Sequence, residues 1–218
     1  MPIPAKPLNE PRLTAKDRVY NTLLEWITDG TMRPGEKIMD TEIAAYFSVS
    51  RTPVREALQL LADQKLIEII PNRESVVSEI HPEEVRDNYE IIGRLCCLAM
   101  DKCAARIDES FLQELTGINS RMKEAAAAGR QKDVLTLDKQ FHQKFFDLAG
   151  NYFLSKFFET LYTHCLRIEN LYFTEPDDSA GSIRQHEEII SCLRSGNMPQ
   201  AQKTMLENWT DTLVNLPF

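Results

Sequence analysis

The feature that most constrains the fold is a series of helical segments that fills the chain from Pro82 to its end. Six such segments are expected, over residues 82–107, 110–129, 131–150, 152–173, 182–196 and 198–216. Each repeats apolar residues at intervals of three and four, which places them on one helix face that must be buried. Glycines end three of the segments, and the connecting loops are short. The pattern predicts a six-helix antiparallel bundle over residues 81–218.

The first eighty residues follow a different pattern and predict a second, smaller domain. A proline-rich stretch, residues 1–13, is expected to be a mobile arm. Three short helices should follow, over residues 17–30, 40–49 and 50–61, with Asp40 as the N-cap of the second. A turn is expected at residues 32–39, and two β-prone runs, 66–70 and 76–80, predict a hairpin. This order is that of a winged helix-turn-helix over residues 14–80, so the fold class is mainly α.

The stretch SRTPVREALQLL, which opens the third helix, carries the clearest functional signal. Pro53 is tolerated only in the first turn, which places the start of the helix at about residues 50–52. Arg51 and Arg55 are one turn apart and project from the same face, opposite the apolar face. Because a guanidinium matches O6 and N7 of guanine in the major groove, we expect these two arginines to read bases.

Overall charge argues against this interpretation. The chain has a net charge of −8 at neutral pH, and residues 1–80 carry ten lysines and arginines against twelve aspartates and glutamates. A protein that binds nucleic acid through its overall charge would be basic. Any binding to DNA must therefore come from a local patch, and it should still weaken steeply with salt.

Several classes of protein are disfavoured by the sequence. No stretch approaches the roughly 18 apolar residues that a membrane span requires, and the N-terminus lacks the apolar region of a signal peptide. The five cysteines form no C-x-x-C motif, which suits a reducing cytoplasm. Cys96 and Cys103 are expected in the core, and a redox-sensing role for the cysteines is the alternative.

An enzyme is also disfavoured. The sequence HEEII falls one residue short of H-E-x-x-H, and no G-x-S-x-G, P-loop or G-x-G-x-x-G motif is present. A metal-dependent hydrolase is the remote alternative, because a metal held by buried histidines could activate water. No general base or oxyanion donor is recognisable beside such a site.

Polar residues interrupt the apolar faces of three of the bundle helices. They are Asp138 and His142 on one helix, His186 on another and Asn208 on the last. Burying a carboxylate and two imidazoles is costly unless they pair with one another or bind an ion. Two interpretations stay open: a metal or ligand site, and a hydrogen-bonded Asp–His pair without a metal.

Three stretches of this sequence resemble one known family. SRTPVREAL is similar to the recognition helix of GntR-type transcription factors, and DKQFHQKFFDLAGN with HEEII resembles the FadR-like C-terminal effector domain, FCD. Six rather than seven helices are similar to the VanR-type short form. The resemblance covers roughly residues 14–215. It implies a cytoplasmic, homodimeric DNA-binding regulator, usually a repressor, that binds an inverted repeat in double-stranded DNA.

The resemblance also assigns residues to the DNA interface. The expected set is Thr41, Ser50, Arg51, Thr52, Arg55 and Arg73. Hydroxyls at the start of the helix suit phosphate oxygens and would fix the register. Thr41 stands where the family has a longer arginine or glutamine, and Glu74 stands where the wing usually has glycine. A carboxylate facing phosphate is repulsive, so we expect a weak wing and recognition dominated by the third helix.

In the helical domain the resemblance implies a small-molecule effector and a divalent metal, zinc, nickel or manganese. The expected metal ligands are Asp138, His142, His186 and Asn208, the last in place of the family's histidine. An amide oxygen should bind zinc or nickel less tightly than a third imidazole. Tyr89, Arg94 and His164 are expected at the effector pocket, and a carboxylate is one candidate effector. The alternative is that the ion or a cysteine is itself the signal.

Overall fold

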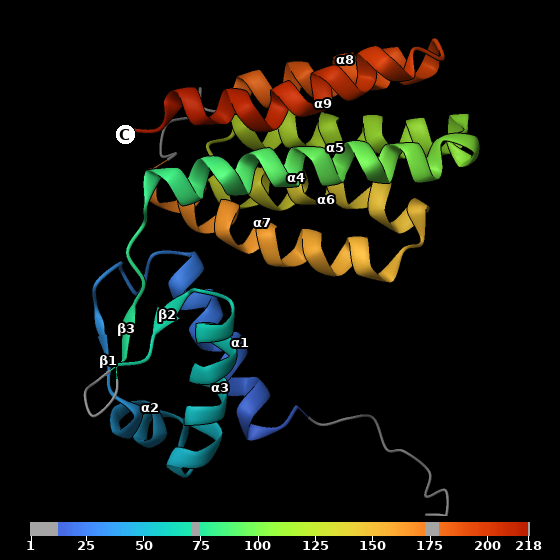
Figure 1. Ribbon diagram of the computed structural model, residues 1–218. Coiled ribbons are helices and arrows are strands. Elements are labelled where there is room, and N and C mark those ends of the chain that lie inside the picture. The colour runs from blue at the N-terminus through green and yellow to red at the C-terminus, as the bar shows by residue number, and fades with distance from the viewer. Residues whose placement is uncertain (1–12, 71–74, 173–178, 218) are drawn as a thin grey trace, which may run out of the picture. The chain divides into compact units, whose positions relative to one another are not determined.

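The computed structural model describes residues 13–70, 75–172 and 179–217 (Figure 1). The proposed arm, apart from its last residue, lies outside the described residues. Contacts divide the described chain into two compact units, residues 13–27 with 31–79 and residues 28–30 with 80–217. The architecture is mainly helical with one small sheet, as the sequence predicts.

The smaller unit contains three helices and three short strands. In chain order they are α1 (Ala15–Thr28), β1 (Lys37–Ile38), α2 (Asp40–Phe47), α3 (Arg51–Asp63), β2 (Ile67–Glu68) and β3 (Ser75–Val77). Thr14 caps α1, since its hydroxyl accepts from the Asp17 N–H while the Asp17 carboxylate accepts from the Thr14 N–H. Helix α3 starts at Arg51, which leaves Pro53 in the first turn as expected.

The sheet has three strands rather than the two expected. Its order is β1-β3-β2 and both pairs are antiparallel, with Lys37 opposite Val76 and Ile67 opposite Val77. The expected turn at residues 32–39 therefore ends in a strand. Gly35, at φ +78°, turns the chain so that its N–H donates to the Val77 carbonyl. A two-residue strand has no periodicity of its own, so only its pairing with β3 reveals it.

The apolar face of α3 forms the centre of the smaller unit's core. Val54, Ala57, Leu58 and Leu61 are buried there with residues of α1, α2 and the sheet. Between α2 and α3, Ser48 adopts a left-handed conformation and its N–H closes the end of α2. Burying one face of α3 leaves its other face, with both arginines, in solvent.

Six α-helices make up the described part of the larger unit. They are α4 (Pro82–Cys103), α5 (Glu109–Ala127), α6 (Gln131–Ala149), α7 (Tyr152–Tyr172), α8 (Ala180–Arg194) and α9 (Met198–Thr212). Short 3-10 turns, η1 (Ala104–Arg106) and η3 (Leu213–Asn215), follow α4 and α9. Helix α4 packs against α6, α7 and α9, and α8 packs against α5 and α9 (Figure 1).

The core of this bundle is mostly apolar, and it encloses a polar cluster that includes Asp138, His142 and His186. Cys96 and Cys103 are fully buried, as expected of small core residues. His142, His186, Asn119 and other polar side chains are buried among them. No helix in the described ranges is both long and apolar enough to cross a membrane.

Candidate functional site

The exposed face at the start of α3 gathers the residues expected to contact DNA. Thr41 in the first turn of α2 is exposed, and so are Ser50, Arg51, Thr52 and Arg55. Ser50 is the N-cap of α3 in an extended conformation, but its hydroxyl does not cap the helix. The other expected contact, Arg73, lies outside the described residues, as does Glu74.

Both arginines of α3 are held by one carboxylate that sequence reasoning assigned differently. Asp40 Oδ2 accepts from Arg51 Nε and Nη2 at 3.2 and 2.9 Å, and from Arg55 Nε at 2.8 Å. Hydrogen bonds from Arg51 and then from Arg55 lower the pKa of the Asp40 carboxyl below its ordinary value. The N-cap of α2 is Met39, not Asp40 as predicted, and no side chain caps it. The carboxylate serves the arginines instead, a contact between helices that a one-dimensional pattern does not reveal.

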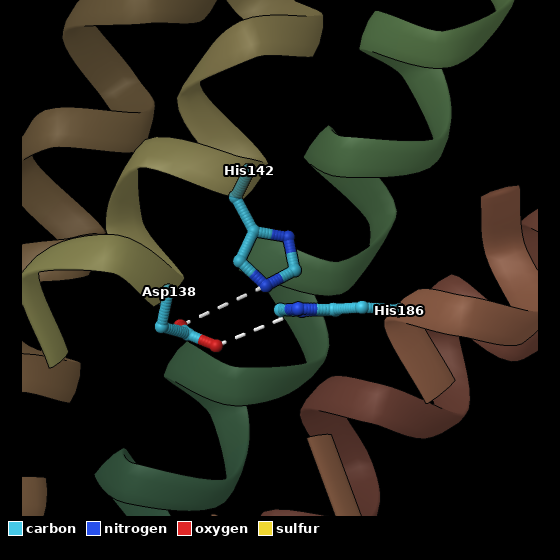
Figure 2. Close-up of side chains that lie close together, drawn as sticks. All are labelled: Asp138, His142 and His186. Carbon is cyan, nitrogen blue, oxygen red and sulfur yellow. Dashed lines mark ion pairs between the residues drawn. The ribbon is translucent and has the colours of Figure 1, made fainter. Parts of the chain in front are cut away.

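A second candidate site lies inside the bundle, where α6 and α8 bring three expected ligands together. Asp138, His142 and His186 point toward one another (Figure 2). The Asp138 carboxylate oxygens lie 3.8 Å from His142 Nε2 and 3.6 Å from His186 Nε2. These separations are too long for hydrogen bonds. Ligands of one zinc-like ion with bonds of about 2.1 Å lie roughly 3 to 3.5 Å apart, so the three side chains fit a metal.

The imidazole of His186 is held in the orientation that a metal ligand requires. Asn119 on α5 donates its amide N–H to the Ile183 carbonyl at 3.0 Å, which leaves its oxygen to accept from His186 Nδ1 at 3.1 Å. Phe141 stacks on the ring with centroids 3.6 Å apart. His186 Nε2 therefore carries a lone pair, and it has no hydrogen-bond partner among the described residues. Sequence reasoning missed Asn119, although a polar residue on an apolar face was its signal.

Asn208 on α9 lies beside both imidazoles. Its amide N–H donates to Gln185 Oε1 at 3.0 Å, so its oxygen is directed elsewhere. The residue is buried and lines the same cavity as Asp138 and His142. The four expected ligands thus come together, with two nitrogen and two oxygen donors.

Burial sets the charge of this cluster. It raises the pKa of the Asp138 carboxyl to about 7 and lowers the pKa of His142 to about 3. Burial, followed by the nearby His142, lowers the pKa of His186 well below its ordinary value. Both imidazoles are therefore neutral at pH 7, the form in which histidine binds metals.

A cavity of about 630 Å³ opens beside the cluster. Its lining includes four carboxylates, on Asp138, Glu169, Glu188 and Asp211. Arg184 is the one lysine or arginine among the lining residues that the structure describes. Burial and then the nearby Asp138 raise the pKa of Glu169 well above its ordinary value. The volume suits a small organic molecule, and the lining favours a positively charged group.

None of the three residues expected at the effector pocket is among the described residues that line the cavity. Tyr89 is fully buried, and its hydroxyl donates to Oε1 of Glu169, a residue of the cavity lining, at 3.3 Å. Arg94 is exposed on α4 and His164 is half-buried on α7, and neither is among the described lining residues.

Comparison with known families matches both units of the chain. The model described as "Bacterial regulatory proteins, gntR family" matches residues 15–77. The FCD domain model matches residues 87–210, which is more than half of the chain.

Proteins that are similar over nearly the whole of this chain include transcriptional regulators. The uncharacterized HTH-type transcriptional regulator YdhC of Bacillus subtilis is 28% identical, over 90% of this chain and 88% of its own. The HTH-type transcriptional repressor RspR of Escherichia coli is 27% identical, over 94% and 87%. The solved structure of E. coli McbR/YncC has the same fold, with a TM-score of 0.78 at 17% identity over 93% and 97% of the two chains.

Proposed function

Because the chain belongs to the GntR family of bacterial regulatory proteins and carries an FCD domain, we propose that it is a repressor released from its operator by a small molecule. It is a transcriptional regulator, and neither its family nor its similar proteins are enzymes. The observation that carries the DNA-binding part of this proposal is the exposed arginine pair at the start of α3. Since its partner would be chromosomal DNA, the protein would act in the cytoplasm.

The DNA interface would rely on local chemistry rather than on overall charge. Arg51 and Arg55 are 52% and 64% exposed and project from the first turns of α3. In a helix-turn-helix these positions enter the major groove, where arginine recognises guanine. Ser50, Thr52 and Thr41 surround them with hydroxyls that suit phosphate oxygens.

Capture of fragmented genomic DNA on the purified protein, followed by sequencing, tests this interface. We expect a shared inverted repeat, lost in the Arg51→Ala/Arg55→Ala variant. The matched control is Arg121→Ala/Arg130→Ala, which removes the same charge from exposed positions of the bundle and should keep the enrichment. Enrichment that survives loss of Arg51 and Arg55 would refute the assignment.

The cavity beside the polar cluster would bind the effector. The described lining carries four carboxyl groups and a single basic side chain, the exposed Arg184, so an anionic effector needs a further positive charge. Asp138, His142, His186 and Asn208 would hold a divalent ion, which when bound supplies that charge as a Lewis acid. We therefore expect small carboxylates to bind when zinc, nickel or manganese is present and to bind poorly after EDTA treatment.

Thermal unfolding with and without zinc, in the presence of a panel of small carboxylates, tests this dependence. His142→Ala should abolish the zinc-dependent stabilisation. His164→Ala removes a histidine outside the cavity lining and should retain it. Equal stabilisation by a carboxylate in EDTA and in zinc would contradict the proposed role of the ion.

The cavity favours an organic molecule as the signal, and the properties of the cysteines disfavour a redox signal. Burial raises the pKa of Cys96 well above its ordinary value, raises that of Cys97 and raises that of Cys103 to about 11, which disfavours the reactive thiolate form. The metal itself is the remaining alternative signal. If zinc alone changes operator affinity at micromolar concentrations, the ion is the signal; if it does not, the ion belongs to the effector site.

A further inference from the structure

Asp40 places the two base-reading candidates in a defined arrangement. All three hydrogen bonds converge on a single carboxylate oxygen, Oδ2. The Asp40 side chain is 20% exposed, whereas both arginine side chains remain more than half exposed. The carboxylate therefore supports the arginines from the protein side and leaves their outer surfaces in solvent.

Asp40 contacts each guanidinium along the edge that carries Nε, which leaves the terminal edge available to another acceptor. Arg55 donates only its Nε–H, and Arg51 donates from Nε and the adjacent Nη2. Both contacts are made from the side of the group, so the edge between the two terminal nitrogens is directed away from Asp40. A guanidinium donates through this terminal edge when it contacts O6 and N7 of guanine together.

We propose that Asp40 is a positioning residue for base recognition, which rests on the proposed function of α3 as the DNA-reading helix. It holds Arg51 and Arg55 with their terminal edges directed outward, before DNA arrives. Its negative charge offsets one of the two positive charges, so it also weakens attraction to phosphate at any sequence. Asp40 thus favours the correct bases over random DNA through orientation, while its charge lowers the affinity for both kinds of DNA alike.

Glu42 offers a matched control on the same turn of α2. It carries the same charge and is exposed, but the structure records no hydrogen bond or ion pair from its side chain to either arginine. Removing Glu42 changes the local charge without releasing the arginines. Comparing the two sites separates orientation from electrostatics.

Selection of binding sites from randomised duplexes by the wild-type protein supplies the specific sequence. Affinities are then measured for that duplex and for one whose conserved guanines are replaced. We expect Asp40→Ala to bind the altered duplex more tightly than the wild type does, and to lose about tenfold in the ratio of the two affinities, the cost of one impaired guanine contact. Glu42→Ala should strengthen binding to both duplexes and change the ratio less than about twofold.

Asp40→Asn retains the shape and an acceptor oxygen and should fall between wild type and Asp40→Ala; it carries the test if the alanine variant fails to fold by circular dichroism. An unchanged ratio in a folded Asp40 variant, or an equal loss on both duplexes, would overturn the inference. If the wild type selects no sequence at all, the proposed function fails instead.

Discussion

Asp138 links the charge of the bundle site to pH. Its carboxyl has a pKa of about 7 because it is buried, while His142, with a pKa of about 3, stays neutral down to acidic pH. A metal displaces the proton of Asp138 and displaces none from either histidine at neutral pH. The pH range of metal binding therefore depends on a single carboxylate.

Metal affinity should rise with pH up to about 7 and then level off. Below the pKa of Asp138 each unit of pH costs up to about tenfold, because the ion competes with one proton. Titration calorimetry with zinc between pH 5.5 and 8 measures this slope. A slope near two, or a rise that continues through pH 8, would contradict control by Asp138 alone.

Asn208 is the weakest of the four proposed ligands, since zinc prefers imidazole nitrogen to a neutral amide oxygen. Asn208→His should increase zinc affinity by roughly ten- to a hundredfold. Competition with a zinc-binding dye measures the change. Asn197→His, at the N-cap of α9 and away from the site, is the control and should leave affinity unchanged. Unchanged affinity in Asn208→His would remove Asn208 from the proposed ligand set.

At the scale of elements, the turn between α2 and α3 holds a residue in a strained conformation. Ser48 ends α2 at φ +53°, a left-handed conformation that non-glycine residues adopt at a cost. The strain is accepted because this turn orients α3, and with it Arg51 and Arg55, relative to α2.

Ser48→Gly should stabilise the smaller unit by about 0.5 to 1 kcal/mol, since glycine adopts this conformation without the steric cost. Denaturant unfolding followed by circular dichroism gives the change. Ser195, which ends α8 at φ −84°, is the matched control: glycine there should give no gain and a small loss. A loss of stability in Ser48→Gly would show that the serine side chain matters more than the strain.

At the scale of the whole molecule, two copies of the protein would be needed to read an inverted repeat. Helix α7 begins with three exposed aromatic residues, Tyr152, Phe153 and Phe157, which are 60–70% exposed in the single chain. Exposed apolar clusters of this kind mark contact surfaces, and we propose that a second copy covers this one.

The double variant Phe153→Glu/Phe157→Glu should shift the protein from dimer to monomer in analytical ultracentrifugation. Placing carboxylates in an apolar interface leaves them without partners, which is costly. Val214→Glu, at an exposed position on η3 beside the cavity rather than on α7, should remain dimeric. A wild-type protein that sediments as a monomer, or a double variant that stays dimeric, would exclude this surface.

The sequence alone determined the helical periods, the start of α3 to within residues 50–52 and the four polar residues on the inner faces of the bundle. These features are local: a proline restricts its own turn, and spacing by three and four assigns each residue to a face. Motif resemblance then indicated the family that the comparisons confirm.

Only the tertiary structure decided which groups meet across elements. Strand β1 exists through its pairing with β3, Asn119 orients His186 from another helix, and Asp40 holds the arginines of α3 instead of capping α2. The acidic lining of the cavity is likewise assembled from separate helices. Periodicity reports the face on which a residue lies but not its neighbour on the next element, and the chemistry of both candidate sites depends on those neighbours.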